Sequence, residues 1–239
     1  MDLEVVKVVL LGEAGVGKTC IIKQFTENKF DKNELSSLSA QYVSKTIDYL
    51  DYKKTIRFDI WDTVGEERFR SIAKIFYKDA KVIIFVYDIT SKKTFDALNN
   101  FWYEEIRNNC MEKPIYAVVG NKNDLYMEQQ VDILDAKDFT KNIGGIFQLT
   151  SAKTSDGISV LFDNIGKKII KPSYQYDEID NTAKENYIKK KEEEERNKKN
   201  RIKLNNNNIN NDNGINKNNN QTNQVDTNKN KKMDAVNKI

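Results

Sequence analysis

Histidine is absent from this 239-residue sequence, and cysteine occurs only at Cys20 and Cys110. Two distant cysteines with no histidine cannot complete the usual ligand set of a zinc site. Two thiols in a chain of this size also fit a reducing compartment better than a disulfide framework. The sequence therefore lacks the composition of a zinc-binding domain and of a disulfide-rich secreted domain.

Long apolar stretches are also missing. No run reaches the roughly 18 residues that a membrane span needs. The first four residues, MDLE, have neither a basic start nor an apolar signal core. We therefore expect a cytoplasmic protein unless another molecule anchors it.

The first 172 residues have no excess of charge of either sign. Residues 173–239 carry 14 Lys/Arg and 11 Asp/Glu, which leaves 25 of each sign for residues 1–172. Such a balance gives no electrostatic reason to expect nucleic-acid binding. Composition also predicts three parts: a folded domain over residues 1–172, a charged extension over 173–204 that favours a solvated helix, and a disordered tail over 205–239, where 15 of 35 residues are Asn.

Apolar runs alternate with helical periods within residues 1–172. The runs predict strands over residues 3–11, 43–50, 55–61, 82–87, 115–120 and 146–150, and the helical spacing predicts helices over 18–25, 94–109, 135–141 and 158–170. The segments VIIFVY and IYAVVG are almost wholly apolar, as a sheet covered by helices on both faces requires. The pattern therefore predicts an α/β domain with an open, mostly parallel sheet, in which ligands bind beyond the carboxyl ends of the strands.

A phosphate-binding pattern follows the first predicted strand. Residues 12–19, GEAGVGKT, match GxxxxGK followed by Ser or Thr. Its glycines let backbone N–H groups turn toward phosphate oxygens at the start of a helix. We expect Lys18 to reach the β- and γ-phosphates and the Thr19 hydroxyl to bind Mg²⁺. The alternative is a plain glycine turn before a helix, which the preceding strand disfavours.

A second polar turn follows the segment IRFDIW. Asp62 stands at the carboxyl end of this strand, where a carboxylate can hold the Mg²⁺ shell, and the N–H of Gly65 can meet a γ-phosphate. Taken alone, this DxxG pattern is equally well explained by a turn that ends a strand.

Two more polar turns, NKND and TSAK, follow the last two predicted strands. In the first, the Asp124 carboxylate can accept two hydrogen bonds from guanine, a pairing that adenine cannot offer, while Asn121 and Lys122 brace the pocket. In the second, the N–H of Ala152 can meet the guanine O6 and the stem of Lys153 can cover the base. Without the preceding strands and the phosphate-binding pattern, either segment would be read only as a polar turn.

In this order the four motifs resemble those of the small GTPases of the Ras superfamily. The segments RFDIWD, EERFRS, IFYKDA and VYDIT resemble its Rab branch, which controls vesicle traffic. The resemblance covers about residues 4–170 and implies a P-loop NTPase G domain with a six-stranded, mostly parallel sheet and helices on both faces. It implies a GTPase that acts as a Mg²⁺-dependent GTP/GDP switch. The residues implied to bind the nucleotide are Gly12, Ala14, Gly15, Val16, Gly17, Lys18, Thr19, Cys20, Phe30, Gly65, Asn121, Lys122, Asp124, Ser151, Ala152 and Lys153.

The implied metal ligands are Thr19, Ser37 and Asp62, and the implied catalytic residues are Lys18 and Glu66. Switch I departs from the Rab pattern, because Ser37 replaces the usual threonine. The hydroxyl is retained, and a one-residue shift of the register to Ser36 stays an alternative.

Switch II departs more sharply. It reads DTVGEER where Rabs normally read DTAGQER, so Glu66 stands in place of the glutamine that orients the attacking water. An ionised carboxylate only accepts hydrogen bonds, whereas an amide also donates them. If Glu66 stays ionised, charge repulsion slows hydrolysis; if the phosphate raises its pKa, the protonated carboxyl mimics the amide. We expect slowed hydrolysis, and the alternative is a non-hydrolysing, GTP-bound adaptor that acts as a protein-binding module.

By the same resemblance, Tyr42, Trp61 and Phe76 form a surface through which effectors bind, although each residue fits a core position equally well. Switches I and II would also meet exchange factors and activating proteins, with the chain as a monomer. The last cysteine is Cys110, and the second residue is Asp2. We therefore expect no prenyl or myristoyl anchor, and recruitment to endomembranes through partners.

Overall fold

The computed structural model of the protein describes residues 1–32, 40–63, 70–110, 112–175 and 196–197, and only the backbone of residues 70–73. The chain divides into two units, Met1–Tyr176 and Asp177–Ile239. In the second unit, Arg196 and Asn197 lie in a helical turn with exposed side chains. The other described residues, up to residue 175, belong to the first unit.

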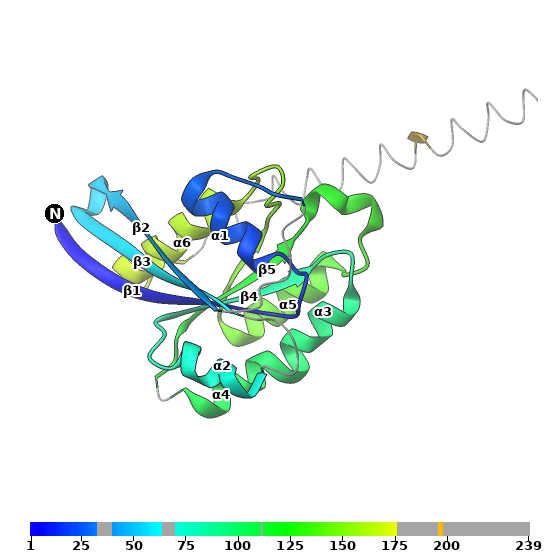
Figure 1. The fold of residues 1–239 in the computed structure, drawn as a ribbon, viewed down its shortest axis with the longest axis horizontal. Coiled ribbons are helices and arrows are strands. Elements are labelled where there is room, and N and C mark those ends of the chain that lie inside the picture. Colours follow the sequence, from blue (N-terminus) through cyan, green and yellow to red (C-terminus); the bar gives the residue numbers. More distant parts are fainter. Residues whose placement is uncertain (33–39, 64–69, 111, 176–195, 198–239) are drawn as a thin grey trace, which may run out of the picture. The chain divides into compact units, whose positions relative to one another are not determined.

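The first unit alternates strands with helices (Figure 1). The strands are β1 (Asp2–Leu11), β2 (Gln41–Tyr49), β3 (Lys54–Asp62), β4 (Val82–Asp88), β5 (Ile115–Asn121) and β6 (Ile146–Leu149). The α-helices are α1 (Lys18–Glu27), α2 (Arg70–Tyr77), α3 (Lys92–Ala97), α4 (Glu104–Asn109), α5 (Ile133–Ile143) and α6 (Ile158–Ile170). The described residues also contain two 3₁₀ turns, η1 (Leu50–Tyr52) and η4 (Asn123–Glu128), and one π-helical segment, η3 (Leu98–Tyr103).

The strands form one six-stranded sheet in the order β2-β3-β1-β4-β5-β6. Only β2 runs antiparallel to its neighbour, β3, while the other four pairings are parallel. All seven residues of β4 are buried, as a central strand covered on both faces requires. The predicted six-stranded, mostly parallel sheet is therefore confirmed.

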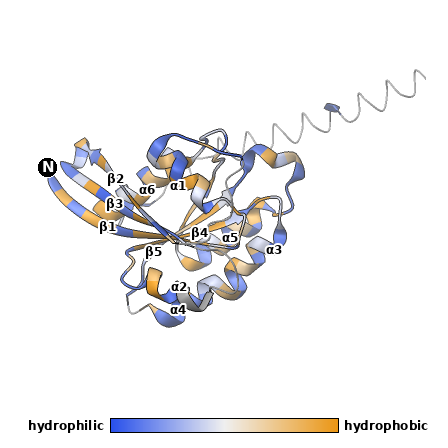
Figure 2. Cartoon of the chain, viewed as in Figure 1, coloured by the Kyte–Doolittle hydropathy of each residue, from blue (hydrophilic) through white to orange (hydrophobic). Residues whose placement is uncertain are grey.

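Helices cover both faces of the sheet. Figure 1 shows α1 and α6 on one side and α2 and α4 on the other. On the first side, the rings of Phe25 (α1) and Phe162 (α6) stack with centroids 3.6 Å apart. On the second, Phe95 (α3) contacts both Tyr87 (β4) and Phe139 (α5) edge to face. The strands carry much of the hydrophobic colour in Figure 2, because they supply the layer between these two sets of helices.

Two helical regions differ from the prediction. The helix expected over residues 94–109 begins at Lys92 and passes through the π-helical segment η3, which buries both Leu98 and Trp102 completely. Helix α2 was not predicted, because its eight residues give only about two turns of apolar spacing. None of the helices in the described ranges is long and apolar enough to cross a membrane.

Candidate nucleotide-binding site

The candidate residues gather at one edge of the sheet. Asp62 and Asn121 are the last residues of β3 and β5, and the phosphate loop and Ser151 follow the carboxyl ends of β1 and β6. Because β1, β3, β4, β5 and β6 are parallel, these ends meet at the same edge.

Two glycines of the phosphate loop allow close approach of other groups. A Cβ at Gly12 would lie 2.2 Å from the carbonyl oxygen of Val86, and one at Gly17 would lie 2.3 Å from Nδ2 of Asn121. Gly17 also has a φ of 95°, which favours glycine. Any side chain at these two positions would push the loop away from β4 or from Asn121.

Lys18 starts α1, and its side chain turns back under the loop. Its Nζ donates to the carbonyl oxygens of Gly12 at 2.8 Å and Glu13 at 2.9 Å. Burial lowers the pKa of Lys18 to about 8, against the opposing effect of the Asp62 and Glu13 carboxylates. The ammonium is thus held inside the loop, where phosphate oxygens would provide the compensating charge.

The next residue, Thr19, contacts the end of β3. Its Oγ1 donates to Oδ2 of Asp62 at 2.6 Å, and Asp62 is only 2% exposed. The adjacent Thr63 donates to the carbonyl oxygen of Leu10 at 2.6 Å, which ties the end of β3 to β1. Hydroxyl and carboxylate oxygens are the ligand types that Mg²⁺ prefers, so the pair Thr19 and Asp62 fits this ion.

Asn121 joins the phosphate loop to the two turns on the base side. Its Nδ2 donates to the carbonyl oxygen of Val16 at 2.9 Å. Its Oδ1 accepts from Oγ1 of Thr150 at 3.1 Å and from the N–H of Ala152 at 3.3 Å. The Ala152 N–H that we assigned to guanine O6 therefore bonds to Asn121 in this structure.

Asp124 is held by the turn after β6. Its Oδ1 accepts from Oγ of Ser151 at 2.7 Å, and its Oδ2 lies 3.5 Å from Nζ of Lys153. Thr154 donates its N–H to Oγ of Ser151 at 3.2 Å, which fixes that hydroxyl. The turns NKND and TSAK thus form one polar cluster around a single carboxylate.

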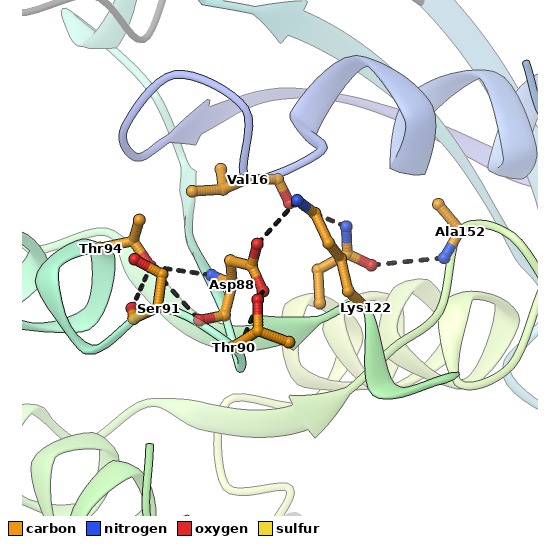
Figure 3. A network of polar contacts seen from close by, with 8 residues as sticks. Val16, Asp88, Thr90, Ser91, Thr94, Lys122 and Ala152 are labelled. Carbon is orange, nitrogen blue, oxygen red and sulfur yellow. Dashed lines mark hydrogen bonds and ion pairs between the residues drawn. The ribbon is translucent and has the colours of Figure 1, made fainter. Parts of the chain in front are cut away.

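Sequence reasoning missed two residues that contact the predicted site. Asp88, at the end of β4, pairs with Nζ of Lys122 at 2.7 Å (Figure 3). Trp102, in η3, donates its indole N–H to Oε1 of Glu13 at 3.1 Å. For Asp88 the sequence contains a signal, an acidic residue directly after the buried run VIIFVY; for Trp102 it contains none.

The remaining predicted site residues fall into two groups, those outside the described ranges and those in or after α1. Ser37, Gly65 and Glu66, together with the alternative Ser36, fall outside the residues that the structure describes. Phe30 follows α1 with 39% of its surface exposed, and Cys20 is half-buried within α1.

The structure brings the three predicted effector-binding aromatics together. The ring centroids of Tyr42 and Trp61 lie 5.5 Å apart, and those of Trp61 and Phe76 lie 6.1 Å apart. Tyr42 is 52% exposed and the other two are partly exposed, so none is a core residue. We call these three residues the aromatic patch.

Comparison with known proteins supports the class that this fold and site define. Residues 7–171 match the model of the Ras family, and the chain therefore belongs to that family. It is 41% identical to human Ras-related protein Rab-22A over 169 residues, which cover 71% of this chain and 86% of that protein. It is 40% identical to Ras-related protein RabJ of Dictyostelium discoideum (69% and 63% covered), and 37% identical to human Ras-related protein Rab-21 (75% and 77% covered).

Within the Ras family these relatives place the chain on the Rab branch. It is a small GTPase that binds guanine nucleotides, hydrolyses GTP and acts in vesicle trafficking. The resemblance stated from the four motifs is thereby confirmed.

Proposed function

We propose that this Rab-type GTPase is a Mg²⁺-dependent switch that binds phosphates at Lys18 and Thr19 and guanine at Asp124. The observation that supports this most directly is the position of Asn121. One buried amide bonds to the phosphate loop at Val16 and to the base-side turn at Ala152. The two halves of the site therefore form one connected unit.

On the phosphate side, the remaining ligands come from the loop and the switches. The backbone N–H groups of residues 12–19 and the Lys18 ammonium bind phosphate oxygens. Thr19 and Asp62 hold the metal ion together with Ser37, which supplies a hydroxyl from switch I. When bound, Mg²⁺ neutralises charge on the β- and γ-phosphates.

On the base side, Asp124 provides specificity for guanine. Ser151 and Lys153 each hold one of its oxygens, so the plane of the carboxylate is set before the base arrives. Phe30 and the stem of Lys153 cover the base. An adenine has neither the N1–H nor the 2-amino group of guanine, so it would make neither hydrogen bond to Asp124, which costs affinity.

Glu66 then sets the rate of hydrolysis, in place of the usual glutamine. As a carboxylate it accepts a hydrogen bond from the attacking water, but it donates none to the transition state and adds charge beside the phosphates. An arginine finger in cis is not evident in switch I, so a partner supplies one. We propose that intrinsic hydrolysis is slow for this reason.

Single-turnover hydrolysis of GTP bound to the full chain tests this proposal. The variant Glu66→Gln restores the donor and is expected to hydrolyse about tenfold faster or more. Glu27→Gln is the matched control, because Glu27 lies at the exposed end of α1, where it pairs with Lys29. It should hydrolyse at the parent rate.

Three results would each contradict one part of this proposal. A Glu66→Gln variant no faster than the parent contradicts the role of Glu66. A parent that stays GTP-bound for hours, even in extracts that contain activating proteins, supports the alternative of a non-hydrolysing adaptor. Comparable affinities for ATP and GTP would overturn the assignment of Asp124.

We further propose that exchange factors, activating proteins and effectors bind at switches I and II and at the aromatic patch. The side-by-side packing and partial exposure of its three rings support an interaction surface, because large exposed apolar groups in contact commonly mark binding sites. Through such partners a monomeric, cytoplasmic chain would act at endomembranes.

A further inference from the structure

Asp88 stands between the base-side turn NKND and the start of α3. Only 8% of its surface is exposed. Its Oδ1 accepts two hydrogen bonds from Thr90, from the N–H at 2.8 Å and from Oγ1 at 2.7 Å. Its other oxygen, Oδ2, lies 2.7 Å from Nζ of Lys122 (Figure 3). Both carboxylate oxygens therefore have defined partners.

The backbone of Asp88 is fixed by the first turn of α3. Its N–H donates to Oγ1 of Thr94 at 3.0 Å, and the same hydroxyl donates to the carbonyl oxygen of Ser91 at 2.7 Å. A hydrogen-bonded path thus runs from α3 through Thr94 and Asp88 to Lys122 (Figure 3). The bonds to Thr90 and Thr94 therefore hold Asp88 in place independently of Lys122.

Lys122 needs such a partner for two reasons. Its backbone has a φ of 67°, a left-handed conformation that a non-glycine residue adopts at some cost. Its long side chain also loses considerable rotamer entropy when it is held in one geometry. It directly follows Asn121, which bonds to Val16, so Lys122 is one residue away from a contact with the phosphate loop.

We propose that Asp88 is a positioning residue for nucleotide retention. It holds the Lys122 side chain along the guanine site and links that site to the first turn of α3. The inference rests on the proposed function and on the expectation from the sequence that Lys122 braces the base.

Dissociation of a fluorescent GDP analogue from the full chain tests it. Asp88→Asn keeps an oxygen for Thr90 but removes the charge that attracts Lys122. GDP should dissociate about tenfold faster, because the charge-assisted hydrogen bond that holds the partly exposed Lys122 side chain is lost. The matched control is Asp96→Asn, since Asp96 forms an exposed ion pair with Lys92 at 3.0 Å on the same helix. It should release GDP at the parent rate.

A double-mutant cycle separates positioning from a purely structural effect. In the background Lys122→Met, which keeps the stem and removes the ammonium, Asp88→Asn should cause no further increase in the dissociation rate. If the two rate increases multiply instead, Asp88 does not act through Lys122 and the inference is overturned.

Failure of the inference and failure of the proposed function give different results. If the parent binds no GDP, the proposed function itself is refuted. If Asp88→Asn and the parent release GDP at the same rate, only this inference is refuted. If Asp88→Asn does not fold, Thr90→Val takes its place, because it removes one donor to Oδ1 at nearly constant volume. It should speed GDP release in the parent and leave the rate unchanged in Lys122→Met.

Discussion

Burial of the Lys18 ammonium destabilises the nucleotide-free protein, and the cost depends on pH. The pKa falls from 10.5 to about 8, chiefly through desolvation. At about 1.4 kcal/mol per pKa unit, this shift corresponds to roughly 3 kcal/mol of unfolding free energy. Below pH 8 both the folded and unfolded chains carry the proton, and the full cost applies.

The cost disappears as the pH rises. Between pH 8 and 10.5 the unfolded chain binds the proton at Lys18 more strongly than the folded chain, so this residue makes stability increase with pH. Above 10.5 the group is neutral in both states, and its burial no longer carries a charge penalty. Bound phosphate has the opposite effect on the pKa, because it compensates the charge.

The variant Lys18→Met isolates this contribution. It removes the buried charge but also the hydrogen bonds to Gly12 and Glu13, worth about 1 kcal/mol each. Near pH 7 the nucleotide-free variant should therefore be more stable than the parent by about 1 kcal/mol. By pH 10.5 the order should reverse, because the parent regains about 3 kcal/mol.

Urea denaturation of nucleotide-free parent and variant between pH 7 and 10.5 measures this difference, since groups that titrate in both proteins cancel. GDP should stabilise the parent strongly and the variant weakly. A stability difference that stays constant over this pH range would refute the reasoning.

Two further predictions concern the stability of the domain at Gly166, in α6, and both stability and GDP release at Asn121, in the site. A Cβ at Gly166 would lie 1.9 Å from Oη of Tyr49, so Gly166→Ala should lower the unfolding free energy in urea by about 1–3 kcal/mol; equal stability would contradict this packing. Asn121→Ala removes three hydrogen bonds and should cost roughly 3 kcal/mol of unfolding free energy while speeding GDP release. Thr140→Ala, another buried polar deletion, should leave that release unchanged; equal GDP release from both would argue against the connecting role of Asn121.

Local sequence pattern sufficed for the sheet and for the phosphate loop. A strand buried on both faces, such as β4, must be apolar throughout, and a loop that wraps phosphates needs glycines at set spacings. Both requirements act within about ten consecutive residues, so they are visible without the fold. The short helix α2 was missed because its position depends on packing, as in the hydrogen bond from Tyr77 to Glu105 at 2.7 Å.

Contacts between distant segments were decided by the tertiary structure. The sequence places Asn121 and Lys122 at the end of a strand, but it does not show that one reaches Val16 and the other Asp88. Nor does it show that Trp102 reaches Glu13, 89 positions away. The first two pairs meet because parallel strands bring their carboxyl ends to one edge, whatever their separation in the chain. Trp102 reaches the loop from the helical segment η3.

The aromatic patch illustrates the same division. From sequence, Tyr42, Trp61 and Phe76 fitted a core and a surface equally well. The antiparallel pairing of β2 with β3 sets Tyr42 opposite Trp61, and α2 brings Phe76 beside them. The sequence by itself therefore determined the class of protein and the chemistry of its site, because those depend on local motifs. Only the tertiary structure decided which side chains support that chemistry and which remain exposed, because burial and pairing depend on the packing of the whole domain.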